Sequence, residues 1–223
     1  MRKIALDIET TGLDFQKGHR IVEIGCVELQ ENFPTGRIWQ KYINPQRNMP
    51  QEAYEIHGLT EEFLEEKPIF KDVAKDFLDF IDSSELIIHN ARFDLPFINH
   101  ELEIINFEKI EMSKVIDTLV SARKLFPGMP VSLDALCKRY KIDNSKREKH
   151  GALLDAELLA EVFLEMQGGR QKGIDLKYGF DNSRNKEKIV NKFLYSKKIY
   201  QLTNEELNLH ENILKKITHN KES

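Results

Sequence analysis

Two acidic residues close the first apolar segment of the chain. Apolar residues alternate with others between Lys3 and Glu9, which predicts a β-strand. Because successive side chains of a strand point to opposite faces, Asp7 and Glu9 share one face near its carboxyl end. Two carboxylates this close repel each other and raise each other's pKa unless a cation lies between them. The pair is therefore either a solvated strand end or part of a cation site.

Two further acidic residues stand near the starts of predicted helices. Asp94 comes four residues after Asn90, in the first turn of a helix that follows a strand, and Asp155 comes five residues after His150. Sites built from several carboxylates suit hard cations such as Mg²⁺ or Mn²⁺. An imidazole, with an unperturbed pKa of about 6.5, accepts protons at neutral pH. His150 is thus either a proton acceptor beside this site or a structural or merely exposed side chain.

These residues need strands and helices to bring them together, and the hydrophobic pattern predicts both. Two more strands, over 21–29 and 37–43, are separated by a turn around 32–36 and form an antiparallel meander with the first. A short strand at 86–89 follows, and a short helix opens at 60–62 within an otherwise irregular segment over 50–66. Longer helices are expected over 69–82, 93–103, 115–126, 132–140 and 152–166. The order predicts an α/β fold, a mixed β-sheet flanked by helices.

Composition favours a globular protein. Of the 223 residues, 40% are hydrophobic and 31% are charged, which supplies a core and excludes a disordered chain. No apolar run approaches the roughly 20 residues that a membrane span needs, and no export signal is recognisable at the N-terminus. The two cysteines, Cys26 and Cys137, resemble buried thiols of a reducing compartment. These features predict a cytoplasmic enzyme or subunit.

Charge is distributed unevenly along the chain. Residues 171–223 carry a net charge of +4 and residues 1–170 a net charge of −8. An acidic body does not bind nucleic acid through its bulk charge. If this body acts on a polyanion, bound divalent cations are the obvious source of local positive charge.

The compact part of the sequence ends at Gly168 and Gly169, which predicts a first domain over 1–170. Residues 171–188 are polar, lack a sustained period and predict a flexible linker. Apolar residues return over 189–223, at spacing compatible with two short helices, but they are too few for independent folding. This segment is expected to be a docking tail.

Three motifs occur in order: Asp-Ile-Glu-Thr-Thr-Gly at 7–12, Ile-His-Asn-Ala-Arg-Phe-Asp at 88–94, and His-Gly-Ala-Leu-Leu-Asp-Ala at 150–156. Together they resemble the DEDDh 3′–5′ exonuclease family. The segments 132–137 and 142–147 narrow the resemblance to proofreading exonucleases of bacterial replicative DNA polymerases. The resemblance covers residues 1–170 and implies a ribonuclease H-like fold.

The resemblance also implies roles for individual residues. Asp7, Glu9, Asp94 and Asp155 match the metal ligands of the family, which would hold two divalent cations, Mg²⁺ or Mn²⁺, and His150 matches its general base. The family releases 5′-mononucleotides from the 3′ ends of nucleic acids. Residues at positions that meet the terminal nucleotide are Asp7, Glu9, Thr10, Thr11, Leu13, Glu52, His57 and Asp155.

The segment after the first domain resembles partner-binding sequences. Gln171, Ile174 and Leu176 match the short peptide through which replication proteins bind the sliding clamp, although a linker could produce this match by chance. Residues 189–223 resemble the tail that docks on the polymerase's catalytic subunit. A small additional core subunit is left open as a partner.

Three functions are compatible with the sequence. The first is a proofreading subunit that acts on mismatched DNA 3′ ends. The second is a free-standing exonuclease on DNA or RNA ends, which would not need residues 171–223. The third is a non-catalytic replication scaffold, which would be expected to lack a catalytic residue, whereas all five are present.

Overall fold

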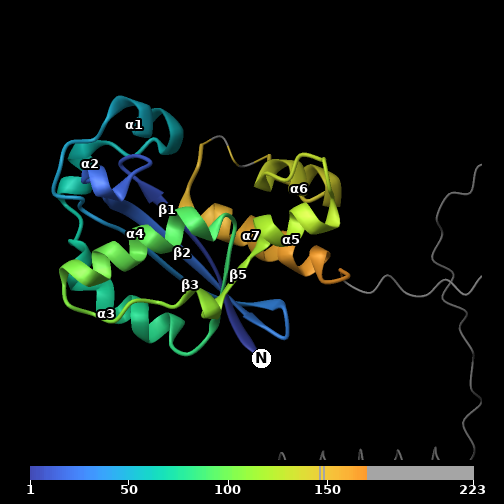
Figure 1. The fold of residues 1–223 in the computed structure, drawn as a ribbon. Helices are drawn as coiled ribbons and strands as arrows, with labels where there is room; N and C mark the ends of the chain where they lie inside the picture. Colours follow the sequence, from blue (N-terminus) through green and yellow to red (C-terminus); the bar gives the residue numbers. More distant parts are fainter. Residues whose placement is uncertain (146, 148, 170–223) are drawn as a thin grey trace, which may run out of the picture. The chain divides into compact units, whose positions relative to one another are not determined.

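A computed structural model describes residues 1–145, 147 and 149–169, and its fold centres on one five-stranded sheet (Figure 1). The strands lie in the order β3-β2-β1-β4-β5. Strands β1, β2 and β3 are antiparallel neighbours, whereas β4 and β5 run parallel to β1. Their bounds are β1 Arg2–Thr10, β2 Ile21–Gln30, β3 Phe33–Tyr42, β4 Glu85–Ile88 and β5 Val115–Asp117. The predicted mixed sheet is confirmed.

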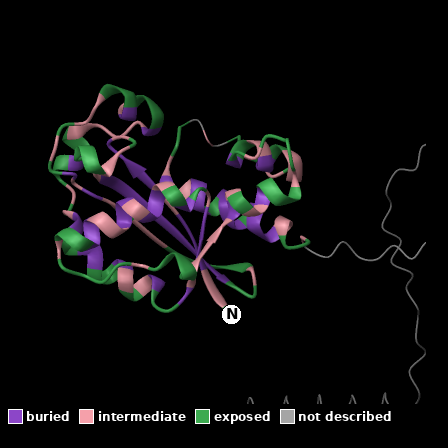
Figure 2. Ribbon diagram, viewed as in Figure 1, coloured by how far each residue is buried: buried purple, intermediate pink, exposed green. Residues whose placement is uncertain are grey.

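Helices cover both faces of the sheet. One hydrophobic cluster joins it to α3 and α4, and a second joins it to α5, α6 and α7. Figure 2 shows that buried residues run along the strands and along parts of the helices. The helices are α1 Gln51–His57, α2 Glu61–Glu65, α3 Phe70–Ile81, α4 Ala91–Ile104, α5 Thr118–Leu125, α6 Leu133–Tyr140 and α7 Ala152–Met166, with short 3₁₀ helices η1 Phe15–Lys17 and η2 Met112–Lys114.

The alternation in β1 decides which layer receives the acidic residues. Ile4, Leu6 and Ile8 pack in the cluster with α3 and α4, whereas Ala5 packs in the cluster with α7. Because Asp7 and Glu9 share the parity of Ala5, they point toward the α7 side of the sheet. The predicted common face of the two carboxylates is therefore also the face on which α7 lies.

The predicted helix over 115–126 is wrong at its start. Residues Val115–Asp117 form β5, which pairs with β4, and the helix begins only at Thr118. The Asp117 side chain accepts hydrogen bonds from the N–H groups of Leu119 and Val120, so it caps α5. A three-residue strand is too short to show a period of its own.

Strand β3 and the segment before α2 also differ from the prediction. Strand β3 starts at Phe33 rather than at residue 37, because the hairpin turn is confined to Glu31 and Asn32, both at positive φ. In the segment over 50–66, which was expected to be irregular before 60, α1 forms between Pro50 and Gly58. It was missed because it buries only two side chains and so carries no apolar stripe.

Several predictions fall outside the described residues. These are the linker over 171–188, the docking tail over 189–223, and the clamp-binding residues Gln171, Ile174 and Leu176. Both cysteines are buried free thiols, as expected. Within the described part of the chain, no helix has the length and apolar character of a membrane span.

Candidate active site

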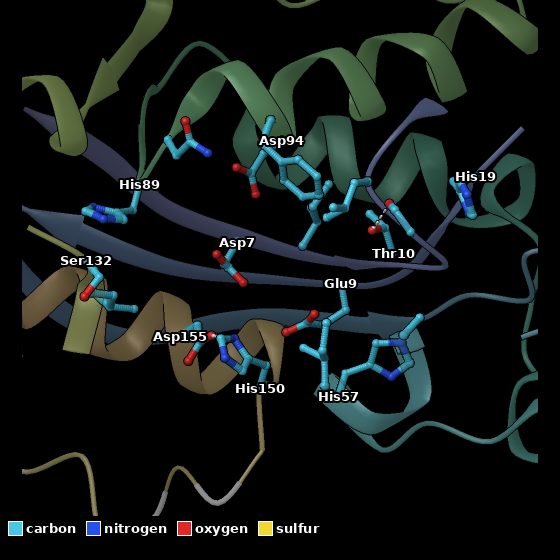
Figure 3. Close-up of a pocket in the computed structure, with 18 of the residues that line it drawn as sticks. Asp7, Glu9, Thr10, His19, His57, His89, Asp94, Ser132, His150 and Asp155 are labelled. Atoms are coloured by element: carbon cyan, nitrogen blue, oxygen red, sulfur yellow. Dashed lines mark hydrogen bonds and ion pairs between the residues drawn. The ribbon is translucent and has the colours of Figure 1, made fainter. Parts of the chain in front are cut away.

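The carboxyl ends of β1 and β4 lie side by side, and this arrangement places Asp94 beside the first acidic pair. The two strands are parallel neighbours, so the turn after β4 lies next to the end of β1. Asn90 makes this turn in the left-handed conformation, with φ 75° and ψ 52°, which asparagine tolerates better than most residues. Helix α4 then starts at Ala91, and buried Asp94 in its first turn faces Asp7 (Figure 3).

Helix α7 approaches the sheet at a glycine. Gly25 lies opposite Asp7 in the β1–β2 pair, and a Cβ atom there would lie 2.3 Å from the backbone carbon of Ala152. The N–H of Ala152 also donates a hydrogen bond of 3.2 Å to the buried carboxylate of Glu23. This close contact brings Asp155, in the first turn of α7, to the end of β1.

The segment before α7 carries His150 into the same region. Its backbone N–H donates to the carbonyl of Ile56 at 3.1 Å, which ties this segment to α1. Its Nδ1 lies 3.3 Å from Oδ2 of Asp155, and its side chain is 48% exposed. His150 is thus accessible from solvent, while the neighbouring carboxylate is buried.

Three of the four predicted metal ligands resist ionisation. Burial is the main reason that the pKa of Asp7 and the pKa of Asp94 lie well above the usual range, and the charges of neighbouring carboxylates add to it. Burial, followed by the charges of Asp155 and Glu23, raises the pKa of Glu9 to about 8. A bound cation would relieve this repulsion, so the cluster has the electrostatic character of a cation site.

Asp155 differs from the other three carboxylates. Burial opposes its ionisation, but its contacts with His150 and Arg147 outweigh burial and lower its pKa. The guanidinium of Arg147 donates from Nε at 2.5 Å and from Nη2 at 2.7 Å to the two oxygens of Asp155. Asp155 is therefore the carboxylate that the protein keeps charged by itself.

The donor set fits a divalent metal ion. Glu9, His150 and Asp155 each offer one ligand atom, and these atoms lie within 4.8 Å of one another. Asp7 and Asp94 extend the set with further buried carboxylates. Oxygen-rich sites of this kind suit hard cations.

A cleft of about 890 Å³ contains every residue predicted for the site in the first domain. Its lining includes Asp7, Glu9, Thr10, Thr11, Leu13, Glu52, His57, Asp94, His150 and Asp155. Leu13 is 81% exposed at the surface of the cleft, and Glu52 lies on α1. The structure thus gathers residues that the sequence separates by most of the domain.

His57 offers an unused hydrogen-bond donor in this cleft. Its Nδ1 accepts a hydrogen bond of 3.0 Å from the N–H of Leu59, and burial lowers its pKa to about 4. The neutral ring therefore carries its proton on Nε2. The backbone of Thr10 opposes this lowering of the pKa, but no partner of Nε2 meets the geometry of a hydrogen bond among the described residues.

Thr10 and Thr11 use their hydroxyl groups within the protein. Buried Thr11 accepts a hydrogen bond from the N–H of Arg20, and Thr10 donates to the carbonyl of Gly12. Any contact of these two residues with a ligand is therefore expected to come mainly from their backbone.

Sequence reasoning assigned no role to Glu23, Gly25, Asp134 or Arg147. Glu23 and Gly25 interrupt the apolar strand over 21–29. This interruption is the only feature of the sequence that marks these two positions as special. Arg147 belongs to one of the resembling segments, but its pairing with Asp155 and with Asp134 depends on tertiary structure. Asp134, on α6, lines the same cleft.

Comparisons with known proteins agree with this geometry. The family model described as Exonuclease matches residues 4–163. DNA polymerase III subunit epsilon of Rickettsia conorii is 50% identical over 222 residues, covering 97% of this chain and 96% of the relative. The corresponding subunit of Salmonella typhimurium is 49% identical over 176 residues, covering 76% of this chain and 72% of the relative.

Solved structures show the same fold. Exonuclease X in complex with 5′-overhanging duplex DNA matches with a TM-score of 0.57 and 28% identity, covering 75% of this chain and 90% of the other. The nuclease domain of 3′hExo, a DEDDh family member bound to rAMP, matches with a TM-score of 0.65 and 18% identity, covering 75% and 92%. The ribonuclease H-like fold is confirmed. The chain therefore belongs to the DEDDh exonuclease family, among the DNA polymerase III epsilon subunits, and is a 3′–5′ proofreading exonuclease.

Proposed function

We propose that this exonuclease hydrolyses mismatched 3′-terminal nucleotides from single-stranded or frayed DNA ends and releases 5′-mononucleotides. Enzymes of its family generally use divalent metal ions; here Asp7, Glu9, Asp94 and Asp155 would hold two cations, Mg²⁺ or Mn²⁺. The observation that carries the proposal is the convergence of four carboxylates from β1, α4 and α7 in one cleft. This complete set argues against a non-catalytic scaffold.

The protein contributes charge, position and a proton acceptor. When bound, the cations supply the positive charge that polarises a phosphodiester and the attacking water. His150 accepts the proton of that water, because its half-exposed ring lies at the edge of the cleft. Asp155, 3.3 Å from Nδ1, stabilises the resulting imidazolium by its negative charge.

The α1 side of the cleft is suited to the terminal nucleotide. The Nε2–H of His57 is available to donate a hydrogen bond to a sugar or base oxygen. Exposed Leu13 can pack against the base, and Glu52 can accept a hydrogen bond from a sugar hydroxyl. The backbone of Thr10 and Thr11 lines the same side.

Selectivity for mismatches follows from the cost of strand separation. A paired terminus must melt before its last nucleotide enters the cleft, at about 1.4 kcal/mol per base-pair step. A mismatch lowers that cost, so the exonuclease does not need to read the base.

Digestion of primer–template DNA with matched or mismatched 3′ ends tests the proposal. We expect 5′-mononucleotides as products, faster release from mismatched and single-stranded ends, and no activity in EDTA. Asp7→Asn should abolish turnover, whereas Glu62→Gln, at an exposed position of α2, should leave it unchanged. Equal rates on both ends, or activity in EDTA, would contradict the proposal.

We also propose that the chain acts as a subunit of DNA polymerase III, as its relatives are named. Residues 1–170 form the exonuclease domain, 171–188 form a linker and 189–223 dock on the alpha subunit. Gln171, Ile174 and Leu176 within 171–176 contact the sliding clamp. A small additional core subunit is a further candidate partner.

Binding measurements test these partner assignments. Deletion of 189–223 should abolish co-purification with the alpha subunit and preserve nuclease activity on single strands. The double substitution Gln171→Ala and Leu176→Ala should weaken clamp binding. Unchanged retention of alpha, or unchanged clamp affinity, would refute the corresponding assignment.

A further inference from the structure

An arginine with a largely buried side chain lies beside Asp155 in the proposed metal site. The Arg147 side chain is only 8% exposed, and its guanidinium contacts three residues that line the cleft. Besides its two bonds to Asp155, it donates from Nη1 to both oxygens of Asp134, at 2.8 Å and 2.9 Å. Nη2 also lies 2.8 Å from Nδ1 of His150.

These contacts engage two groups that the reaction requires. Both oxygens of Asp155 accept hydrogen bonds from Arg147, so a cation that binds Asp155 meets the positive charge of the guanidinium. An arginine is always a donor, so its contact with Nδ1 of His150 occupies a ring lone pair that could otherwise accept a proton. In this arrangement, the guanidinium takes the electrostatic place of a cation.

The second partner of the arginine is more exposed to solvent than Asp155 is. Asp134 is on α6, and its side chain is 57% exposed, compared with 4% for Asp155. Arg147 can therefore leave Asp155 and keep a charged, bidentate partner.

We propose that Arg147 is a positioning residue that serves as the internal counter-ion of Asp155, and that a divalent cation must displace it toward Asp134 to load the site. The same displacement frees Nδ1 of His150, so metal loading and release of the proton acceptor are coupled. This proposal rests on the proposed function, because it requires that Asp155 binds the metal.

Two substitutions should change metal affinity in opposite directions. Arg147→Gln removes the positive charge that stabilises Asp155 when no metal is bound. It also removes the charge that repels the bound metal, so it should tighten Mn²⁺ binding about tenfold. Asp134→Asn removes the alternative partner and leaves the guanidinium with Asp155, so it should weaken binding several-fold. A merely structural Arg147 would predict weaker binding in both variants.

Isothermal titration of the full chain with Mn²⁺ in the absence of DNA measures these affinities. Arg147→Lys should restore an affinity near that of the unchanged chain, because it keeps the charge. Lys138→Gln, on the exposed side of α6, is the matched control and should bind as the unchanged chain does. Arg147→Gln should also lower the Tm in EDTA, and this deficit should shrink in saturating Mn²⁺.

The outcomes separate this proposal from the proposed function. Suppose that the unchanged chain binds Mn²⁺ and that Arg147→Gln binds it equally well or more weakly. This result would overturn the role of Arg147 and leave the proposed function standing. If the unchanged chain itself bound no Mn²⁺, both the proposed function and the role of Arg147 would be overturned. Tighter Mn²⁺ binding by Arg147→Gln together with weaker Mn²⁺ binding by Asp134→Asn would support the displacement of Arg147 from Asp155 by the cation.

Discussion

The free energy of unfolding of the metal-free protein should fall as the pH rises from 6.5 to 8. The cause is the buried carboxylate cluster, in which Glu9 has a pKa of about 8 instead of 4.5. Between these two values the folded protein holds a proton that the unfolded chain has released. Raising the pH therefore favours the unfolded chain.

The size of this loss of stability follows from the difference between the pKa of Glu9 in the folded protein and in the unfolded chain. Each such group lowers the unfolding free energy by about 1.36 kcal/mol per pH unit, so Glu9 alone accounts for about 2 kcal/mol over this window. Asp7 and Asp94 act in the same direction, because their pKa values are also raised. His57 and His89 have lowered pKa values and contribute only below about pH 6.5, where the unfolded histidines take up protons.

Urea unfolding in EDTA at several pH values measures this slope. Glu9→Gln should make the slope shallower and raise the stability at pH 8, whereas Glu62→Gln, at an exposed position of α2, should leave the slope unchanged. Saturating Mn²⁺ should remove the slope from the unchanged chain. A stability in EDTA that stays constant or rises between pH 6.5 and 8 would refute the reasoning.

Three further predictions probe other parts of the structure. His150→Ala should lower kcat by about 10²- to 10⁴-fold with little change in the affinity for single-stranded DNA, and a near-normal kcat would remove the histidine from the proton-accepting role. Gly25→Ala should cost about 1–3 kcal/mol in urea unfolding and weaken Mn²⁺ binding, because α7 must move away from the sheet; unchanged values would contradict the close contact. Arg20→Met leaves buried Glu101 without its bidentate partner and should cost about 3–5 kcal/mol, whereas Arg20→Met combined with Glu101→Leu should recover most of this loss. If the double variant were as unstable as Arg20→Met, the unpaired charge of Glu101 would not be the cause of the lost stability.

The sequence predicted those features that have a local cause. The alternation around Asp7 and Glu9 predicted both the strand and their common face, because side-chain direction in a strand depends only on parity. The long apolar stripe of α7 likewise predicted its helix over 152–166, with the observed bounds. The resembling motifs selected five residues that the structure brings to one cleft.

Features that depend on contacts across the chain were not predictable. Helix α1 has no apolar stripe, and β5 is defined only by its pairing with β4. The role of Gly25 depends on the position of α7, and that of Arg147 depends on the approach of α6 and α7. No local pattern contains this information.

The contact between β2 and α7 also determines when the protein can become active during its synthesis. β1 and β2 leave the ribosome early, but Asp155 and His150 belong to the last part of the domain to emerge. A nascent chain that ends before α7 has neither the fourth carboxylate nor the imidazole. The nuclease centre can therefore form only after translation has passed nearly the whole domain.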